Sequence, residues 1–249
     1  MAELRIAFVP GVTPGKWLER WRERHPEVPV TATRYDDGAD PRGLLASGDA
    51  DLVFLRFDDG VKPADATTHV IPLYEELPVV CAPREHEVEL YDDEVPWSEL
   101  DGQTWLDLAD YPPAVGGTAM AVEVVGTGAG LLVLPMSVGR LYRRKDVVQK
   151  ILTGVPSTRI GVAWLKPIGD EPEDPQVEEF IGIVRGRGAN SSRQPSVQER
   201  ERREADAAQR KRQRSPQESS RGGARTSGKR PGGGSTGSKR RGGPARGRR

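Results

Sequence analysis

The sequence predicts an α/β fold built on parallel strands, followed by a disordered basic tail. Strands and helices alternate as β-α-β-α-β within the first 60 residues, a spacing that calls for parallel strands joined by right-handed crossovers. The segment 44–56, LLASGDADLVFLR, joins a helix to a short continuous apolar run. Such a run is typical of a parallel strand that is buried on both faces. Residues 188–249 are mainly Arg, Gly, Ser, Pro, Gln and Lys, which offer almost nothing to bury.

The formal net charge of zero conceals two parts of opposite charge. Residues 188–249 hold 18 basic and 5 acidic residues, a net charge of +13, whereas residues 1–187 hold 19 basic and 32 acidic residues, a net charge of −13. The single cysteine, Cys81, rules out an internal disulfide and a multi-cysteine metal site. No apolar run approaches the ~20 residues of a membrane helix, and the N-terminus lacks the long apolar segment of a signal peptide. We therefore expect a soluble, cytoplasmic protein.

The first half of the chain predicts a regular alternation of elements. We expect strands at 4–9, 28–33, 50–57, 67–73 and 77–82, and helices at 16–25 and 41–46. His25 precedes a proline and ends the first helix, and Gly48 can take the positive φ that ends the second. In sheets of this kind, ligands bind at the carboxyl ends of the strands. Here those ends are 10–13, 34–38 and 56–59.

The second half is less regular. We expect an acidic loop between 83 and 99, a strand from 103 to 108, helices at 118–125, 135–142 and within 173–187, and strands at 131–134, 147–152 and 159–165. The last helix carries an apolar face of Val177, Phe180, Ile181 and Val184. Within the tail, residues 198–214 predict a transient charged helix stabilised by Glu and Arg at i, i+4 spacing. That helix has no apolar stripe with which to dock.

Six segments in this order resemble the effector-binding domain of LysR-type transcriptional regulators. They are LRIAFVPG, RHPEV, LLASGDADLVFLR, VIPLYEELPVVCAP, WSELDGQTWLDL and VEVVGTGAGLLVLPMSVGRL, and the resemblance extends over residues 3–187. It implies a type 2 periplasmic-binding-protein fold of two α/β lobes with a small-molecule cleft between them. The first lobe would comprise 4–72 and 166–187 and the second 80–147, with the chain crossing near 73–79 and 148–162. The domain would thus end at 187 and the tail occupy 188–249.

The sequence departs from the family pattern at two points. The family places a winged helix-turn-helix ahead of the effector domain, whereas here that domain begins at Glu3. The passage 108–119 is too short for the helix-and-strand unit that relatives carry there. We therefore expect a stand-alone effector-binding domain with a reduced second lobe, which senses a small molecule or assists transcription regulation. The resemblance also implies a homodimer, or a pair with a partner regulator, formed through the helix 17–24 and the strand 28–33.

The candidate ligand site lies where the first two strands end. Gly11, Val12 and Thr13 join the first strand to the first helix. Backbone N–H groups there, with the Thr13 hydroxyl, can hold the carboxylate of a small effector at the helix N-terminus. Asp37 and Gly38 follow the second strand and complete the set on that side.

Arg56 ends the third strand and has two interpretations. It can pair bidentately with an acidic ligand, or it can form a surface salt bridge with Asp58 or Asp59. Both interpretations stay open at this stage.

Other chemistry-bearing residues predict no enzyme, cofactor or metal site. Gly126, Gly128 and Gly130 follow a helix and precede a strand, the reverse of the dinucleotide-binding order, so they are explained as a helix end. His86 lies in a solvated acidic loop, and Cys81 lies in an apolar strand with no base beside it.

The tail supports an alternative function as a nucleic-acid-associated protein whose folded domain is a scaffold. Basic residues spaced with glycine attract DNA or RNA phosphate without reading sequence, although the missing aromatics remove base stacking. The other explanation is a tail that only solubilises the acidic body. The candidate phosphate contacts are Arg221, Arg225, Lys229, Arg230, Lys239, Arg240, Arg241, Arg246, Arg248 and Arg249.

Overall fold

The computed structural model describes residues 3–36, 38–61, 63–188, 191 and 194–214, with side chains described as far as residue 210. The chain divides into two units, the first ending at residue 201 and the second beginning at residue 202. Within the first unit, the strands make two separate sheets of five and four strands.

The first sheet has the strand order β2-β1-β3-β9-β4. β1 is parallel to both β2 and β3, and β9 runs antiparallel between β3 and β4. The parallel β-α-β-α-β unit predicted for the first 60 residues is therefore confirmed. The strands are β1 (Leu4–Phe8), β2 (Val30–Arg34), β3 (Leu52–Asp58), β4 (Thr68–Glu76) and β9 (Thr158–Leu165).

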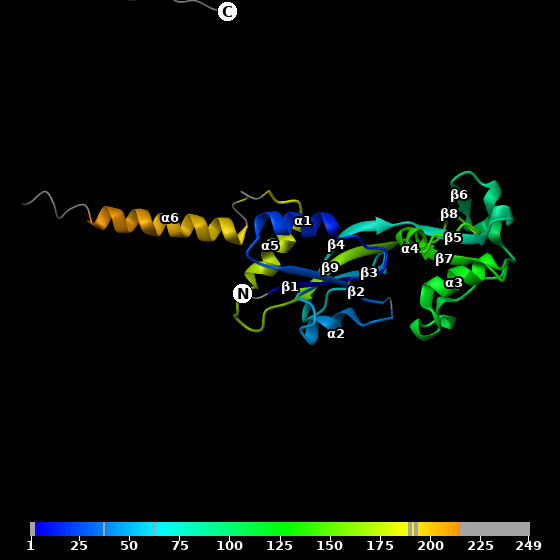
Figure 1. Ribbon diagram of the computed structural model, residues 1–249, viewed down its shortest axis with the longest axis horizontal. Helices are drawn as coiled ribbons and strands as arrows, with labels where there is room; N and C mark the ends of the chain where they lie inside the picture. The colour runs from blue at the N-terminus through cyan, green and yellow to red at the C-terminus, as the bar shows by residue number, and fades with distance from the viewer. Residues whose placement is uncertain (1–2, 37, 62, 189–190, 192–193, 215–249) are drawn as a thin grey trace, which may run out of the picture. The chain divides into compact units, whose positions relative to one another are not determined.

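Both faces of β3 are covered, as its continuous apolar run predicts. Leu52 and Phe54 pack into a core formed with α1 (Gly15–Arg24) and α5 (Pro175–Val184). Val53 and Leu55 face a smaller core against α2 (Pro41–Ala46). Figure 1 shows α1 and α5 together on one side of the first sheet and α2 on the other.

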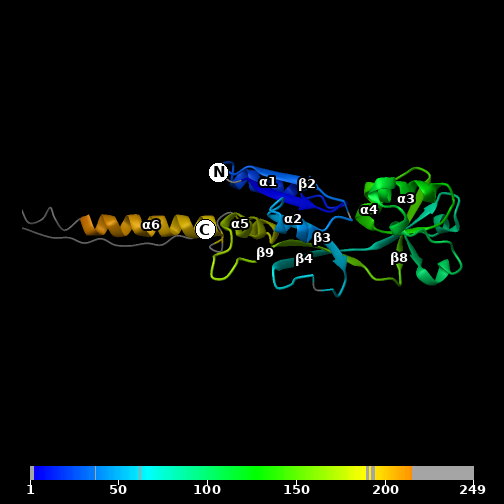
Figure 2. The ribbon, with the colours of Figure 1, turned by 90° about the horizontal axis from the view of Figure 1, so that it is seen from below.

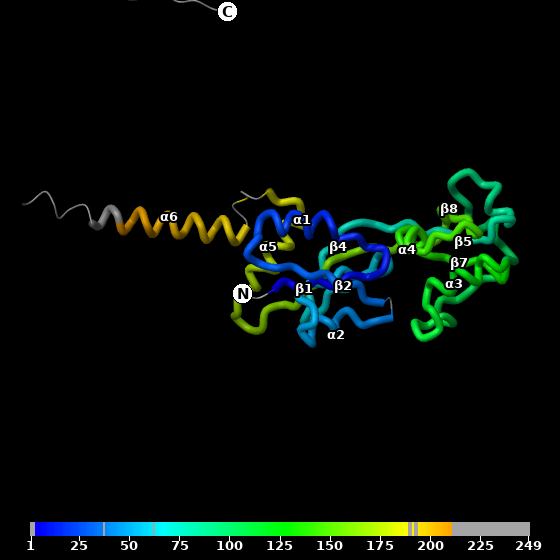
Figure 3. The backbone as a smooth tube through the Cα atoms, viewed as in Figure 1, coloured from blue at the N-terminus to red at the C-terminus, as the bar shows by residue number. Residues whose placement is uncertain are grey.

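The second sheet has the strand order β6-β8-β5-β7. Its strands are β5 (Pro78–Pro83), β6 (Glu94–Pro96), β7 (Leu132–Pro135) and β8 (Val147–Thr153). α3 (Gly117–Gly126) and α4 (Met136–Leu141) share one core with one face of this sheet, and Figure 2 shows the two helices beside each other. Figure 3 traces the chain through its two crossings between the sheets.

The acidic loop after β5 is more structured than the sequence predicts. It contains β6 and two short 3-10 helices, η1 (Glu87–Leu90) and η2 (Trp97–Leu100). Val88, Val95 and Leu100 from this loop are buried and cover the second face of the sheet. The burial of these scattered apolar residues, rather than local propensity, gives the loop its order.

The predicted strand at 103–108 is wrong. Only an isolated bridge between Trp105 and Leu131 forms there, and Trp105 instead stacks on Trp97 with ring centroids 4.7 Å apart. The following passage holds only the 3-10 helices η3 (Leu108–Asp110) and η4 (Pro113–Val115) before α3 begins. It has no additional helix-and-strand unit, as its length predicts.

The charged helix predicted within the tail at 198–214 is present as α6 (Pro195–Arg214). The sequence predicted helical character from residue 198 but not the contacts that begin it. Val197 is buried, and the backbone N–H and hydroxyl of Ser196 donate to the Glu179 carboxylate at 3.1 and 2.9 Å. The basic residues proposed to contact phosphate, from Arg221 to Arg249, lie outside the described residues.

Candidate functional site

The carboxyl ends of β1, β3 and β4 meet at the edge of the first sheet from which the chain crosses to the second. β4 ends at Glu76 and β5 begins at Pro78, so the chain passes from the first sheet to the second through Leu77 alone. The chain returns between Thr153, the last residue of β8, and Thr158, the first of β9. This is the edge at which open α/β sheets place their ligands.

Arg56, near the end of β3, organises this edge. Its Nε donates to Oε2 of Glu76 at 2.7 Å, and its Nη2 donates to the Pro10 carbonyl at 2.8 Å. Nη2 also lies 3.4 Å from the Ser137 hydroxyl, which in turn donates to Oε1 of Glu76. The side chains of Arg56 and Glu76 are only 12% and 3% exposed. We refer to Pro10, Arg56, Glu76 and Ser137 as the Arg56 cluster.

The Arg56 cluster joins the two sheets, because Ser137 belongs to α4 and follows β7 of the second sheet. The start of α4 is also fixed by the backbone N–H of Met136, which donates to the Leu77 carbonyl at 2.9 Å. Gly11 packs directly against Ser137 with a φ of +90°, and a Cβ at position 11 would collide with the Ser137 hydroxyl. Only glycine therefore fits this close approach.

The other predicted site residues that the structure describes do not gather at the Arg56 cluster. Val12 is buried, and its backbone N–H already donates to the Val9 carbonyl at 3.2 Å. Thr13 and Gly38 are exposed, and Asp37 lies outside the described residues. Of the predicted set, the fold brings Gly11 and Arg56 to one place.

Sequence reasoning missed Glu76 and Ser137. Arg56 pairs with Glu76, while Asp59 is held by Arg159 of the neighbouring strand β9. Glu76 lies 20 residues from Arg56 and Ser137 lies 81 residues away. No local pattern in the sequence signals these contacts, since they arise from strand order and from the packing of α4.

Tyr74 stands at the margin of the cluster. Burial raises the pKa of its phenol, the Glu76 carboxylate raises the pKa further, and Arg56 opposes them. The phenol is therefore neutral at pH 7 and can donate a hydrogen bond to a ligand.

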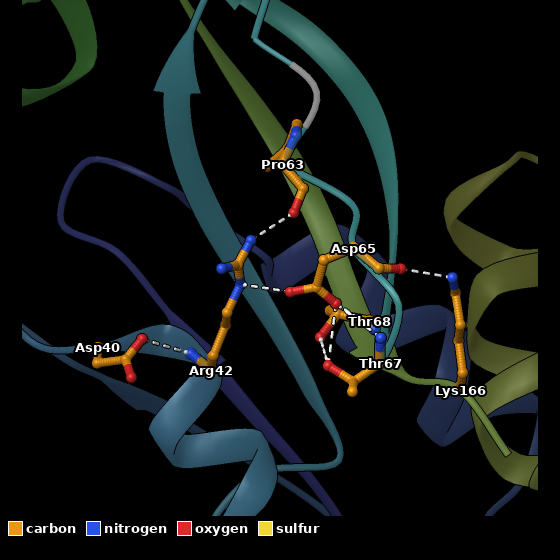
Figure 4. A network of polar contacts seen from close by, with 7 residues as sticks. All are labelled: Asp40, Arg42, Pro63, Asp65, Thr67, Thr68 and Lys166. Atoms are coloured by element: carbon orange, nitrogen blue, oxygen red, sulfur yellow. Dashed lines mark hydrogen bonds and ion pairs between the residues drawn. The ribbon is translucent and has the colours of Figure 1, made fainter. Parts of the chain in front are cut away.

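A separate polar network holds the loop before β4 against α2. Asp65 accepts the backbone N–H groups of Thr67 and Thr68 at 2.8 Å and faces the Arg42 guanidinium at 3.3 Å. These contacts, led by the Thr67 N–H, lower the pKa of Asp65. The polar groups satisfy one another, so this network is structural. Figure 4 shows its members, Asp40, Arg42, Pro63, Asp65, Thr67, Thr68 and Lys166.

Neither thiol nor metal chemistry has support in the part of the chain that the structure describes. Cys81 is fully buried, and burial raises the pKa of its thiol to about 12. The described residues include no group of three or more His, Cys, Asp or Glu side chains arranged to hold a metal ion. The described helices also include none that is long and apolar enough to cross a membrane.

Comparison with known proteins gives a family match for part of the chain. Residues 1–115 match the sequence profile of the LysR substrate binding domain. The comparison with curated protein sequences gives no significant match.

Solved structures with a similar fold have low sequence identity to this chain. A mutant of the OxyR regulatory domain from Pseudomonas aeruginosa is 17% identical with a TM-score of 0.54, covering 74% of this chain and 97% of that one. The BenM effector binding domain with its effector benzoate is 16% identical with a TM-score of 0.56, covering 74% and 90%. Full-length CbnR in complex with its target DNA is 17% identical with a TM-score of 0.55, covering 74% and 70%.

At this level of identity, the structural likeness establishes the fold alone. The fold matches the one that the six sequence segments predicted, and the profile match covers the β-α-β-α-β unit and the first crossing. The predicted resemblance is therefore confirmed: residues 1–115 match the LysR substrate binding domain, and the folded body has the fold of the effector-binding domains of LysR-type regulators.

Proposed function

We propose that the folded body senses a small carboxylate-containing effector that binds between two lobes, and that Arg56 recognises the carboxylate. In this proposal, residues 4–72 and 166–187 contribute the first lobe and residues 80–147 the second. The Arg56 cluster is the observation that carries the proposal, because it joins the two sheets through a charged group at the ligand-binding edge. The BenM effector binding domain, which holds benzoate, supports a carboxylate as the chemical class.

Glu76 provides the switching element in this mechanism. Its carboxylate occupies Arg56 and accepts the Ser137 hydroxyl, so it holds α4 against the first sheet. A carboxylate on the effector competes with Glu76 for the Arg56 guanidinium, since both form the same charge-assisted hydrogen bonds. When the effector carboxylate replaces Glu76 on Arg56, Ser137 and α4 are loosened from the first sheet. An effector that prefers the exchanged state then shifts the population of the two arrangements by its differential affinity.

A thermal-shift series on the full chain tests the proposal, with benzoate and other small aromatic and aliphatic carboxylates as probes. A ligand that binds only the folded state stabilises it by about 2.7 kcal/mol when its concentration is 100 times Kd. We expect the shift to disappear in Arg56→Lys, which keeps the charge but loses the planar fork. Arg159→Lys is the matched control, because Arg159 belongs to the same sheet and pairs with Asp59 instead. Cooperative melting with no shift across the panel, or equal shifts in both variants, contradicts the proposal.

The basic tail supports a second candidate function, association with nucleic acid. Its support is the net charge of +13 over residues 188–249. Electrophoretic mobility of a DNA or RNA duplex with the full chain, and with a chain ending at residue 214, tests it. Binding that weakens steeply with salt and is lost with the deletion supports phosphate contact by the tail. Equal binding by both chains assigns the contact to residues 1–214.

A further inference from the structure

A pocket lies on the second sheet, and none of its lining residues belongs to the Arg56 cluster. Its volume is about 300 Å³, and its lining residues are Arg84, Arg140, Arg143, Val147, Val148, Gln149 and Lys150. Four of these seven residues are cationic. A volume of this size lies at the lower end of the range for small-molecule sites.

Strand pairing and hydrogen bonds bring the three segments of this basic pocket together. β5 and β8 are antiparallel with Pro83 opposite Val147, which places Arg84 at the beginning of β8. The Nε of Arg84 donates to the Lys145 carbonyl at 2.9 Å. Gln149 donates to the Gly139 carbonyl at 2.7 Å and so joins β8 to α4, whose last turn carries Arg140. Arg140 and Lys150 therefore belong to a helix and a strand, whereas Arg84 and Arg143 belong to the segments that follow β5 and α4.

The acidic side chains near the pocket leave its positive charge incompletely balanced. Glu89 contacts Arg84 at 3.4 Å, and Asp146 pairs with Arg144 at 3.0 Å. Lys150 donates to a backbone carbonyl, that of Asp92, at 2.6 Å.

The two remaining cations of the pocket have no counter-charge among the described residues. The side chains of Arg140 and Arg143 form no ion pair or hydrogen bond there. Residues 1–187 have a net charge of −13, so a site with surplus positive charge is unusual on this body. Like charges that converge at one site repel one another unless an anion joins them.

We propose that the basic pocket binds a small multivalent anion that carries two or more phosphate or carboxylate groups. Guanidinium groups bind both kinds of anion through paired, parallel hydrogen bonds. The apolar part of the lining is limited to Val147 and Val148, which does not suit an aromatic or aliphatic ligand. A multivalent anion can contact Arg140 and Arg143 together, whereas a monovalent one leaves part of the charge unmatched.

Isothermal titration of the full chain tests the proposal, with inorganic pyrophosphate and citrate as probes and acetate as the monovalent comparison, all at matched ionic strength. Pyrophosphate and citrate separate a phosphate preference from a carboxylate preference. We expect saturable binding of one of them to one site, and at least tenfold weaker binding in the double variant Arg140→Ala/Arg143→Ala. Both side chains are exposed, so their removal should leave the melting temperature unchanged.

Arg144→Ala is the matched control, because Arg144 is adjacent in sequence but pairs with Asp146 and does not line the pocket. It should bind as the unmodified chain does. Equal binding by the double variant assigns the anion to the tail or another surface and overturns the proposal. Acetate binding as tightly as both probes, or a short oligonucleotide displacing pyrophosphate from the pocket at lower concentration, also overturns it.

Discussion

Removal of the Arg56 guanidinium is the sharpest stability test of the Arg56 cluster. Arg56→Met keeps most of the aliphatic stem but leaves the Glu76 carboxylate, whose side chain is 3% exposed, without its cation. Removing one partner of a buried ion pair costs about 3–5 kcal/mol, because the other charge stays buried and unpaired. Ser137 still donates to Glu76, so we expect a loss near the lower end of that range.

The double variant Arg56→Met/Glu76→Gln separates the ion pair from other effects of the substitution. With neither charge left in the site, the double variant should lose much less stability than the two single variants together. Residues in direct contact typically show interaction energies of about 0.5–3 kcal/mol in such cycles. The double-mutant cycle measures this coupling directly.

Urea unfolding of the full chain supplies the measurement. Tryptophan fluorescence and circular dichroism should give coincident transitions, and the dependence of the unfolding free energy on urea should stay constant among variants. Arg159→Met is the control, because its ion pair with Asp59 is largely exposed and exposed pairs contribute little. A loss below about 1 kcal/mol in Arg56→Met, or an additive cycle, would refute a stabilising role for the buried pair.

Three further predictions concern other parts of the fold. Gly11→Ala should lower stability by about 1–3 kcal/mol through backbone strain and also push against Ser137, as thermal melting would report. Burial raises the pKa of Glu179, but hydrogen bonds from its neighbours outweigh burial and lower it overall. Its contribution is therefore present above the ordinary carboxyl pKa and lost as the pH falls through the folded value, so Glu179→Gln should flatten the acid limb of a pH–melting curve. Cys81, fully buried, should resist a thiol reagent until urea unfolds the chain.

Each of these predictions has an outcome that contradicts it. Gly15→Ala is the control for position 11, because nothing lies within 4 Å of its Cβ position, and equal melting temperatures for the two variants would exclude the steric argument. If Glu179→Gln leaves the acid limb of the pH–melting curve unchanged, the Glu179 carboxylate is not the source of that limb. Rapid labelling of Cys81 in the native protein at pH 8 would show that the second sheet opens readily.

The main layout of the fold could be predicted from the sequence because its signals are local. The apolar run 52–55 lies within four consecutive residues, and its burial on both faces follows from that pattern. Gly48, two residues after the end of α2, takes a positive φ of 74°, as the turn between helix and strand requires. The helix positions and the parallel pairing in the first 60 residues also follow from sequence patterns that extend over a short stretch of the chain.

Only the tertiary structure decided which residues meet at the candidate site. Arg56 was predicted there, but its partner Glu76 comes from a strand two places away in the sheet, and Ser137 comes from the other sheet. The anchoring of α6 on Glu179 and the gathering of Arg84 with Arg140 at the basic pocket depend on similar long-range contacts. Periodicity and turn chemistry act over a few residues, whereas strand order and helix packing join residues that are tens of positions apart. The sequence alone therefore determined most of the elements and placed Gly11 and Arg56 at the site, and packing determined the partners of Arg56.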